Sequence, residues 1–487
     1  MAERRYPLAQ AAADLRAAGL LDGWFAAARG GRWSRHAADD PAPAGAFLGA
    51  ALDSRALPAG ALFVGLAGDR TDGRHYVDGA LRNGAGAALT RPHDGPGPDP
   101  LLSGDAGGEA VILLSRDPQA ALTLLADRWR TRLATPAVAV TGSNGKTTTK
   151  DLLACLLATS GPTHATAGNF NNDLGLPLTL LGLRESHRWA VLELGASAPG
   201  DIDRLARLAR PRVGVITNAA GAHLEGFGGL EGVVRTKGEL LDHLPADGAA
   251  VLDRDHHAYA AWRDRAPCPV LDWGESAGPR RWSWEPAARG GRVTLDGETW
   301  VLPLPGRHNG ANLAAAATAA RALSGEALDI AVALTQFRGS PHRNRVLDAA
   351  GVTVLDDTYN ANPESVLAAA RGLADLPGDG RRLAALGAMA ELGPRAADLH
   401  RETGAALRAL GLDGLWVVGE AARPLAEGFG AHARWLPDVD AAAADAADAA
   451  RPGDRLLVKG SRSAGMERFV DRFLARRNPD LSNLESR

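Results

Sequence analysis

The stretch that decides the fold reads Ala137-Val-Ala-Val-Thr-Gly-Ser-Asn-Gly-Lys-Thr-Thr148 and continues as TKDLLACLLA to residue 158. The apolar run 137–140 predicts a buried strand, and the residues after Lys146 predict a helix. Glycines between a strand and a helix let backbone N–H groups curl around a phosphate, and the helix N-terminus adds a favourable dipole. The stretch therefore predicts a phosphate-binding loop, with Val140 where the full G-x-x-x-x-G-K-T pattern has its first glycine.

Two side chains of this loop carry chemistry of their own. The Lys146 ammonium can neutralise the β- and γ-phosphates of a nucleotide, and the Thr147 hydroxyl can reach a bound Mg²⁺. The residues of the loop predicted to hold ATP are Gly142, Ser143, Asn144, Gly145, Lys146, Thr147 and Thr148.

Strands and helices alternate on both sides of this loop, which predicts an α/β protein. Further strand candidates follow it at 188–195, 213–220, 248–255 and 268–274, then a hairpin at 292–306 with an Asp-Gly turn and a helix at 312–323. After a basic hinge at 338–345 the pattern restarts, with strand candidates at 352–358, 382–388, 415–420 and 455–461 and a helix at 439–450 that we expect to be solvated. The segment 47–90, before the loop, predicts a small mixed α/β unit.

We therefore predict three domains: a small mixed α/β N-terminal domain (1–115), a central doubly wound P-loop ATPase domain (116–340) and a C-terminal Rossmann-like domain (341–487). The chain has 487 residues, of which 45% are hydrophobic and 23% charged, enough for sizeable cores. Its net charge of −3 provides no basic footprint for nucleic acid or anionic lipid. The chain has only two cysteines, Cys155 and Cys268, too few for a disulfide framework, and the sequence shows no signal peptide or membrane span. We therefore expect a soluble cytoplasmic protein without membrane insertion.

Lysine is rare: among 54 basic residues only Lys146, Lys150, Lys237 and Lys459 are lysines, and all others are arginine. This bias suggests that lysine is kept where a guanidinium cannot replace an ammonium. We expect Lys150, one turn into the predicted helix, to be an exposed residue that tolerates arginine.

Polar residues beyond the loop suggest a metal and substrate site. The segment Thr163–Pro177 is dense in amides and hydroxyls, as in a loop that lines a polar site. Glu193 ends a predicted strand, where a carboxylate can hold Mg²⁺, and His223 follows another strand and could be a further ligand.

The chain resembles the ATP-dependent Mur ligases, which extend the peptide of the peptidoglycan precursor. The resemblance covers nearly the whole chain in order: Asp53-Ser-Arg55, TGSNGKTT, Glu193, His223, Lys237-Gly-Glu-Leu, Gly306-Arg-His-Asn-Gly-Ala-Asn312, Arg343, Asp357-Thr-Tyr-Asn-Ala-Asn-Pro363, Glu391-Leu-Gly393 and Lys459-Gly-Ser-Arg-Ser463. The GNFNND loop, DTYNANP, and KGSRS with the following Met466-Glu467 are most similar to the branch that adds a dipeptide. One departure is Gly387-Ala388-Met389, where the family commonly has Gly-Asp-Met.

The resemblance implies a ligase that joins D-alanyl-D-alanine to UDP-N-acetylmuramoyl-tripeptide through an acyl phosphate, with ATP and Mg²⁺ as cofactors. It implies catalytic roles for Lys146, Lys237, Glu193 and His223, and metal binding by Thr147, Glu193, His223 and Lys237, the last as a carbamate. It adds His308, Asn309, Asn312, Arg343 and Asp357 to the ATP site, although Asn312 fits a helix N-cap equally well. The substrate residues it implies are Ser54, Arg55, Asn169, Asn171, Asn172, Tyr359, Asn360, Asn362 and Lys459.

Three alternatives stay open. The chain could be a sister ligase that adds a single amino acid, a folylpolyglutamate-like enzyme, or a nucleotide-binding module without catalysis. We expect a monomer whose partners are the two small-molecule substrates. The third residue of the tripeptide, diaminopimelate or lysine, is not readable from these motifs.

Overall fold

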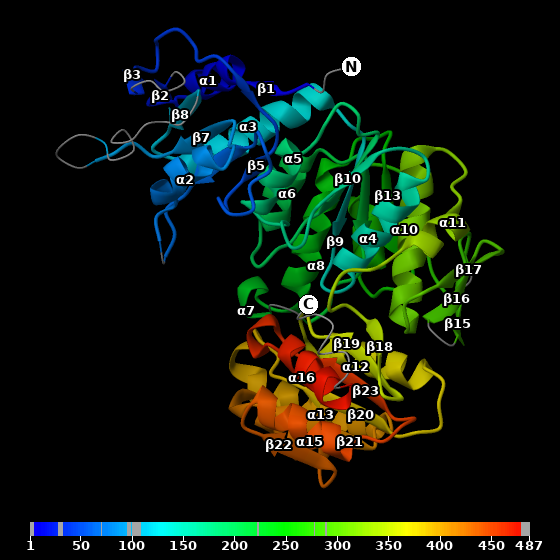
Figure 1. Cartoon of the computed structure of the whole chain (residues 1–487). Coiled ribbons are helices and arrows are strands. Elements are labelled where there is room, and N and C mark those ends of the chain that lie inside the picture. Colours follow the sequence, from blue (N-terminus) through cyan, green and yellow to red (C-terminus); the bar gives the residue numbers. More distant parts are fainter. Residues whose placement is uncertain are drawn as a thin grey trace. The chain divides into compact units, whose positions relative to one another are not determined.

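The computed structural model describes residues 4–27, 33–69, 71–94, 99, 109–221, 224–276, 278–287 and 290–478 (Figure 1). By their internal contacts the residues form two compact units, and each unit is described by itself. The first unit comprises Met1–Ala137, Gly161–Leu194 and Arg204–Arg210, and the second comprises Val138–Ser160, Gly195–Asp203 and Pro211–Arg487. No helix among the described residues is long and apolar enough to cross a membrane.

The first unit is built on a mixed six-stranded sheet in the order β3-β2-β8-β7-β6-β5. Strands β5 to β8 run parallel, while β2 is antiparallel to both β3 and β8, so the mixed α/β N-terminal domain is confirmed. The strands are β2 (Gly23–Ala27), β3 (Trp33–His36), β5 (Ala50–Ala51), β6 (Leu62–Gly65), β7 (Ala87–Thr90) and β8 (Ala110–Leu114), and a separate pair joins β1 (Tyr6–Pro7) to β4 (Ala46–Phe47).

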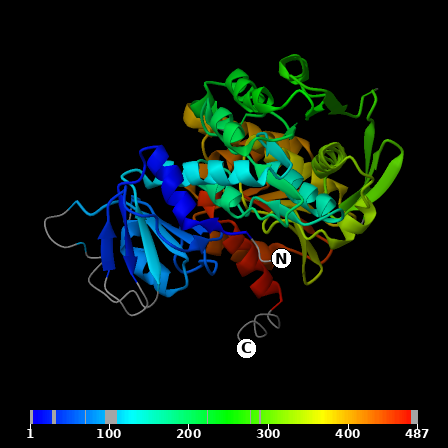
Figure 2. The same cartoon turned by 90° about the horizontal axis from the view of Figure 1, so that it is seen from above.

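Three helices accompany this sheet: α1 (Leu8–Ala17), α2 (Val77–Arg82) and α3 (Pro118–Leu133). Helix α2 buries Val77 and Ala80 against the sheet residues Phe63 and Ile112. Helix α1, dark blue, contacts α3, cyan, as Figure 2 shows from above. The first unit also holds β10 (Thr163–Ala165), parallel to β11 (Trp189–Glu193), and α5 (Gly175–Leu181), which contacts α3.

Parallel strands in the order β9-β12-β13-β14 form the central part of the second unit. They are β9 (Ala137–Thr141), β12 (Val213–Ile216), β13 (Ala249–Asp253) and β14 (Val270–Trp273), each within a predicted strand or one residue from it. All but Asp253 and three residues of β14 are buried, as continuous apolar runs require. The helices of this part are α4 (Lys146–Ala158), α7 (Leu224–Phe227), α8 (Leu230–Gly238), α9 (Tyr259–Arg265), α10 (Arg307–Ser324) and α11 (Ile330–Gln336); α6 (Asp201–Ala209) spans both units.

The predicted hairpin is confirmed as β16 (Gly290–Leu295) and β17 (Glu298–Leu302), joined by Asp296-Gly297, which both have positive φ. A third strand that we did not predict, β15 (Trp282–Ala287), pairs with β16 and buries Trp282 and Trp284. Helix α10 begins five residues before the predicted start, because His308-Asn-Gly-Ala-Asn312 forms its first turns.

The C-terminal sheet has the order β18-β19-β23-β20-β21-β22, and all strands but the antiparallel edge strand β18 run parallel. The strands are β18 (Arg345–Ala349), β19 (Val352–Asp357), β20 (Arg382–Leu386), β21 (Gly414–Val418), β22 (Ala433–Leu436) and β23 (Arg455–Lys459), and the helices are α12 (Pro363–Asp375), α13 (Ala396–Ala409), α14 (Arg423–Phe429), α15 (Val439–Ala449) and α16 (Glu467–Arg477). Neighbouring strand residues face opposite sides: Val354 and Leu456 pack with α15 and α16, whereas Leu355 and Leu457 pack with α12, α13 and α14. The Rossmann-like prediction is therefore confirmed.

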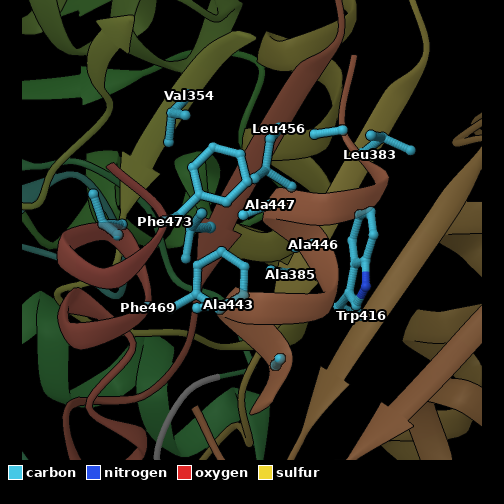
Figure 3. Close-up of a cluster of buried hydrophobic side chains, with 14 of the residues drawn as sticks. Val354, Leu383, Ala385, Trp416, Ala443, Ala446, Ala447, Leu456, Phe469 and Phe473 are labelled. Atoms are coloured by element: carbon cyan, nitrogen blue, oxygen red, sulfur yellow. The ribbon is translucent and has the colours of Figure 1, made fainter. Parts of the chain in front are cut away.

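The Ala-rich segment 439–450 forms α15, but the expectation of a solvated helix was wrong for one face. Ala443 and Ala446 are fully buried in a cluster with Phe469 and Phe473 of α16 (Figure 3). Ala442 is fully buried in the same cluster. Spacing of three and four places these alanines on one stripe, and their small side chains let the helix approach its neighbours closely.

Candidate active site

The phosphate-binding loop connects β9 to α4 as predicted, and two of its glycines are required by the backbone. Gly142 has φ +145° and Gly145 has φ +81°, conformations that L side chains rarely adopt. A Cβ at Gly142 would overlap Oγ1 of Thr217, and one at Gly145 would overlap Oδ1 of Asn312. The loop is therefore packed closely against the residues that follow β12 and against α10.

Hydrogen bonds tie this loop to the segment after β12. The Asn144 N–H donates to Oδ1 of Asn218 (2.9 Å), and the Thr217 hydroxyl donates to the Asn144 carbonyl (2.6 Å). Ser143 accepts a bond at Oγ from the Ala220 N–H (2.9 Å). Sequence reasoning did not select Thr217 or Asn218; their position directly after a parallel strand, at the edge where such sheets bind ligands, was the available signal.

Lys146 begins α4, and its Nζ lies 2.8 Å from the Gly142 carbonyl oxygen and 3.2 Å from that of Ser143. The ammonium is thus held at the mouth of the loop that is predicted to receive phosphates. Thr147 and Thr148 are buried in the first turn of α4.

Lys237 is buried near the end of α8, with 2% of its surface exposed. Burial, reinforced by the positive charge of Lys146, lowers the pKa of its ammonium to about 7, against the weaker opposing effects of Asp201 and Glu239. Its Nζ lies 5.4 Å from the ring centre of Phe227. Near pH 7 a large share of this amine is neutral and nucleophilic, a state that arginine cannot reach.

Glu193 lies in the first unit at the end of β11 and is buried. Its Oε1 accepts a hydrogen bond from Nδ2 of Asn171 (2.7 Å), whereas Oε2 is buried without a hydrogen-bond partner among the described residues. A buried carboxylate oxygen without a donor suits a cation ligand. In the same loop, Oδ1 of Asn172 accepts a hydrogen bond from the N–H of Gly175, the first residue of α5 (2.8 Å), and Asn169 is exposed.

No group of three or more His, Cys, Asp or Glu side chains forms a ready metal site within the described ranges. Mg²⁺ is usually held by one or two carboxylates together with substrate phosphates and water, so a lone buried carboxylate such as Glu193 fits it. His223, the other predicted ligand, lies outside the described residues.

At the start of α10, the alternative of an N-cap role for Asn312 is excluded, because Gly306 is the N-cap and Asn312 is the sixth residue of the helix. Its Nδ2 donates to Oδ1 of Asn309 (3.2 Å), and its Oδ1 faces Gly145 of the phosphate loop. Burial lowers the pKa of His308 to about 4, so this imidazole is neutral at physiological pH.

The predicted C-terminal residues meet around Asp357 at the end of β19. Lys459 is buried, and its Nζ donates to Oδ2 of Asp357 (2.5 Å) and to the Asn360 carbonyl (2.7 Å). Oδ1 of Asp357 accepts bonds from the backbone and the side chain of Asn344, which sequence reasoning missed. This ion pair fixes the loop that carries Tyr359 and Asn360.

Arg343 and Tyr359, which were assigned to different ligands, lie against each other, with the guanidinium carbon 3.9 Å from the ring centre.

At position 388, where the family's aspartate is replaced by alanine, the carbonyl accepts a hydrogen bond from the backbone N–H of Ser461 (2.9 Å).

Ser54 and Arg55 belong to the first unit. Arg55 forms a paired contact with Asp53 through Nε (2.9 Å) and Nη2 (2.7 Å), and these bonds lower the pKa of Asp53 to about 2. The Ser54 carbonyl accepts a bond from Asn83 (3.1 Å).

The expectation that Lys150 is exposed was wrong. Its side chain is 5% exposed and its Nζ lies 2.6 Å from Oδ1 of Asp151, whose Oδ2 accepts a bond from Ser340. The physical reason is its place four residues after Lys146, on the same inward face of α4.

We therefore expect Lys150→Arg to lower the free energy of unfolding by about 1–3 kcal/mol, because a larger planar guanidinium must enter a filled space. Urea denaturation followed by circular dichroism measures this, with Arg235→Lys on exposed α8 surface as control, expected within about 0.5 kcal/mol of the parent. Equal free energies of unfolding for Lys150→Arg and the parent would show that position 150 tolerates arginine, as the sequence predicted.

Asp253 ends β13 and was not selected from the sequence. Burial raises its pKa to about 6, and the charges of Asp255 and Glu275 add to this. Because the folded state favours the protonated form, the stability associated with this group is present at low pH and is lost as pH rises from about 4 to 6.

Asp253→Asn, which carries no charge, is expected to raise the free energy of unfolding by roughly 1–2 kcal/mol at pH 8, after allowance for solvent screening, and by less at pH 5. Urea unfolding at both pH values tests this. An equal effect of the substitution at both pH values would contradict the assigned cause.

Comparisons with known proteins identify the family of the chain. Residues 140–320 match the family model "Mur ligase middle domain" and residues 342–462 match "Mur ligase, glutamate ligase domain". A UDP-N-acetylmuramoyl-tripeptide–D-alanyl-D-alanine ligase of Synechocystis is 36% identical over 432 residues, covering 87% of this chain and 91% of the relative.

Two solved structures are similar over most of the chain. A crystal structure of MurF from Acinetobacter baumannii has a TM-score of 0.82 at 30% identity and covers 97% of this chain and all of the other. A MurF ligase of Thermotoga maritima, in complex with ADP, has a TM-score of 0.75 at 30% identity and covers 89% and 98% of the two chains. The chain belongs to the Mur ligase family, and its fold is the three-domain α/β fold of that family.

Proposed function

We propose that this chain is an ATP-dependent, ADP-forming amide ligase that adds D-alanyl-D-alanine to UDP-N-acetylmuramoyl-tripeptide in peptidoglycan synthesis. The similarity to relatives of that activity along most of the chain supports it. The observation that carries the chemistry is the buried Lys237, whose pKa near 7 suits an amine that must react rather than a simple surface cation.

The reaction must activate a carboxylate, which is a poor acyl donor. The tripeptide carboxylate attacks the γ-phosphorus of ATP, the bond to the bridging oxygen breaks, and ADP leaves. The amine of D-alanyl-D-alanine then attacks the acyl-phosphate carbonyl, loses a proton, and expels phosphate as the amide forms. Both anions of the first step must be held together, so positioning and charge neutralisation dominate the catalysis.

The chain's own residues serve these steps in distinct ways. Gly142 to Gly145 present backbone N–H groups to phosphate, and Lys146 neutralises charge on the transferred group. Asn309 and Asn312 line the nucleotide side of the loop, and Arg343 and Asp357 belong to the same site. In the first unit, Ser54 and Arg55 bind the uridine nucleotide and the Asn169–Asn172 loop binds the peptide substrates. In the second unit, Tyr359, Asn360 and Lys459 form or support a peptide-binding surface.

We propose Thr147, His223 and the carbamate of Lys237 as Mg²⁺ ligands in the second unit and Glu193 as a Mg²⁺ ligand in the first unit; Mg²⁺, when bound, would spread the charge of the phosphates. The partnerless Oε2 of Glu193 is the feature of the structure that supports this assignment. The carbamate forms when the neutral Lys237 amine attacks CO₂ and loses a proton. We propose that the enzyme acts as a cytoplasmic monomer on these two small molecules.

One assay separates the candidate functions. Phosphate release is measured with ATP, Mg²⁺ and UDP-muramoyl tripeptide, with D-alanyl-D-alanine, single amino acids or no acceptor. We expect turnover only with the dipeptide. Turnover with a single amino acid would identify a sister ligase, and turnover without acceptor would contradict both. Mass spectrometry of products from tripeptides ending in diaminopimelate or lysine identifies the preferred precursor.

The folylpolyglutamate alternative is supported by fold alone. A folylpolyglutamate synthase of Mycobacterium tuberculosis has a TM-score of 0.59 at 20% identity.

A further inference from the structure

The second unit contains a direct side-chain contact between the phosphate loop and the C-terminal α/β part. Nδ2 of Asn362, at the start of α12, lies 2.8 Å from Oδ1 of Asn144 in the phosphate loop. The two residues are 218 positions apart in the sequence. They were assigned to different ligands, Asn144 to ATP and Asn362 to the peptide substrates.

The orientation of the Asn362 amide is determined by a second bond. Its Oδ1 accepts the backbone N–H of Ser365 (2.9 Å), as the N-cap of α12, and Oγ of Ser365 accepts the Asn362 N–H (3.0 Å). A backbone N–H can only donate, so Oδ1 must face it and Nδ2 must face Asn144. The side chain of Asn144 must therefore point its Oδ1 toward Nδ2 of Asn362.

The Asn144 side of the contact is also held in place. The backbone N–H of Asn144 is bonded to Asn218, and its carbonyl accepts bonds from Thr217 and from Nδ2 of Asn218. The side chain of Asn144 therefore extends from a loop whose main chain is already anchored. A displacement of the phosphate loop would be transmitted to Asn362 rather than absorbed by a mobile backbone.

A second bond lies beside the first. The Gly221 N–H, in the segment after β12, donates to Oε1 of Glu364 (3.2 Å), the second residue of α12. On the other side, Lys459 holds the loop that leads to Asn362 through Asp357 and Asn360. The start of α12 is thus bonded directly at Asn362 and Glu364, and the loop before it is held at Asn360.

We propose that Asn362 is a positioning residue: its amide joins the first turn of α12 to the phosphate loop through Asn144, so that the peptide-binding part of the chain is aligned with the ATP phosphates. This inference rests on the proposed ligase function. Asn362 then acts through the phosphate loop rather than by touching the dipeptide.

The test separates the link to Asn144 from the helix cap. Asn362→Ser keeps an N-cap oxygen of equal quality but is too short to reach Asn144. Ser365→Ala removes the other half of the capping box and leaves the Asn362 side chain in place, so it is the matched control. Asn144→Ala removes the acceptor, and the double variant Asn144→Ala/Asn362→Ser completes a double-mutant cycle.

We expect Asn362→Ser and Asn144→Ala each to lower kcat by about three- to tenfold or more, the range of one hydrogen bond. The kcat of the double variant should be no lower than that of the poorer single variant. The KM for D-alanyl-D-alanine should change by less than about threefold in each variant. Ser365→Ala should keep the parent kcat. Multiplicative losses in the double variant, or a rise in the dipeptide KM with unchanged kcat, would overturn the proposal.

A second readout does not depend on catalysis. Hydrogen–deuterium exchange of the peptide that covers residues 141–150 should accelerate in Asn362→Ser and stay unchanged in Ser365→Ala. Unchanged exchange in both variants would refute the link even if the parent proves to be an active ligase. If the parent proves to be inactive and exchange still accelerates in Asn362→Ser, the link is supported and the proposed function is refuted.

Discussion

Lys237→Ala is expected to lose about 100- to 1000-fold in kcat, with recovery of part of the rate when a short-chain carboxylic acid is added. The variant removes the amine that would become the carbamate, and an added carboxylate can occupy the vacated space with the same charge. Lys237→Arg is expected to be as inactive and not to be rescued, because the guanidinium stays protonated and fills the space. Initial rates of phosphate release, with and without the acid, provide the measurement.

The pH dependence of this site follows from the same burial. A lysine with a pKa near 10.5 would have about one neutral amine in three thousand at pH 7, whereas a pKa of about 7 leaves about half neutral. After removal of CO₂, reactivation at a fixed concentration of dissolved CO₂ should be faster at pH 8 than at pH 6, because the neutral fraction of the Lys237 amine rises with pH.

The control for Lys237 is Arg235→Ala, two residues away on the same helix. The Arg235 side chain is 71% exposed and should be dispensable. Full activity in Lys237→Ala, or rescue of Lys237→Arg by the acid, would be incompatible with a carbamate ligand.

The substitution Lys146→Ala is expected to have the second large effect on activity. We expect a loss of about 1000-fold in kcat/KM for ATP, since one charge-assisted phosphate contact is removed from a site that must join two anions. Lys146→Arg should recover little, because a planar guanidinium does not fit between the Gly142 and Ser143 carbonyls, which now lie 2.8 and 3.2 Å from Nζ. Steady-state kinetics and calorimetric ATP binding measure both variants.

This variant has a further consequence at Lys237. The Lys146 charge is the second cause of the low Lys237 pKa, so its removal should raise that pKa and shift the profile of reactivation, measured at fixed dissolved CO₂, to higher pH. An unchanged profile in Lys146→Ala would assign the low pKa to burial alone. Retention of more than half of the activity in Lys146→Arg would contradict the proposed role of the ammonium.

Much of the architecture could be read from local sequence. Strand β9, helix α4 and the glycines between them follow from an apolar run, a helical spacing and two residues that must adopt positive φ. The edge strands β18 and β22 were missed, because short strands with exposed faces carry no continuous apolar run. The burial of α15 was missed because alanine has a weak apolar signal on either face.

The residues of the candidate site likewise divide into those that the sequence predicted and those that it missed. Motif spacing selected Lys146 and Glu193 as candidates, and the family resemblance selected Lys237 and Lys459. It could not find Asn344 or Asp253, since an isolated amide or carboxylate has no distinctive pattern. It misjudged Lys150, because exposure depends on what packs against α4, and those residues are far away in the sequence.

The sequence by itself therefore determined the fold class, the phosphate loop and the family, because strand period, helix period and the backbone demands of glycine are local properties. Only the tertiary structure decided the electrostatic state of the lysines and the partners of the amides. It buried Lys237 and lowered its pKa to about 7, placed Lys459 on Asp357, and brought Asn362 to Asn144. Desolvation and hydrogen-bond geometry depend on residues that approach through folding, which no local pattern contains.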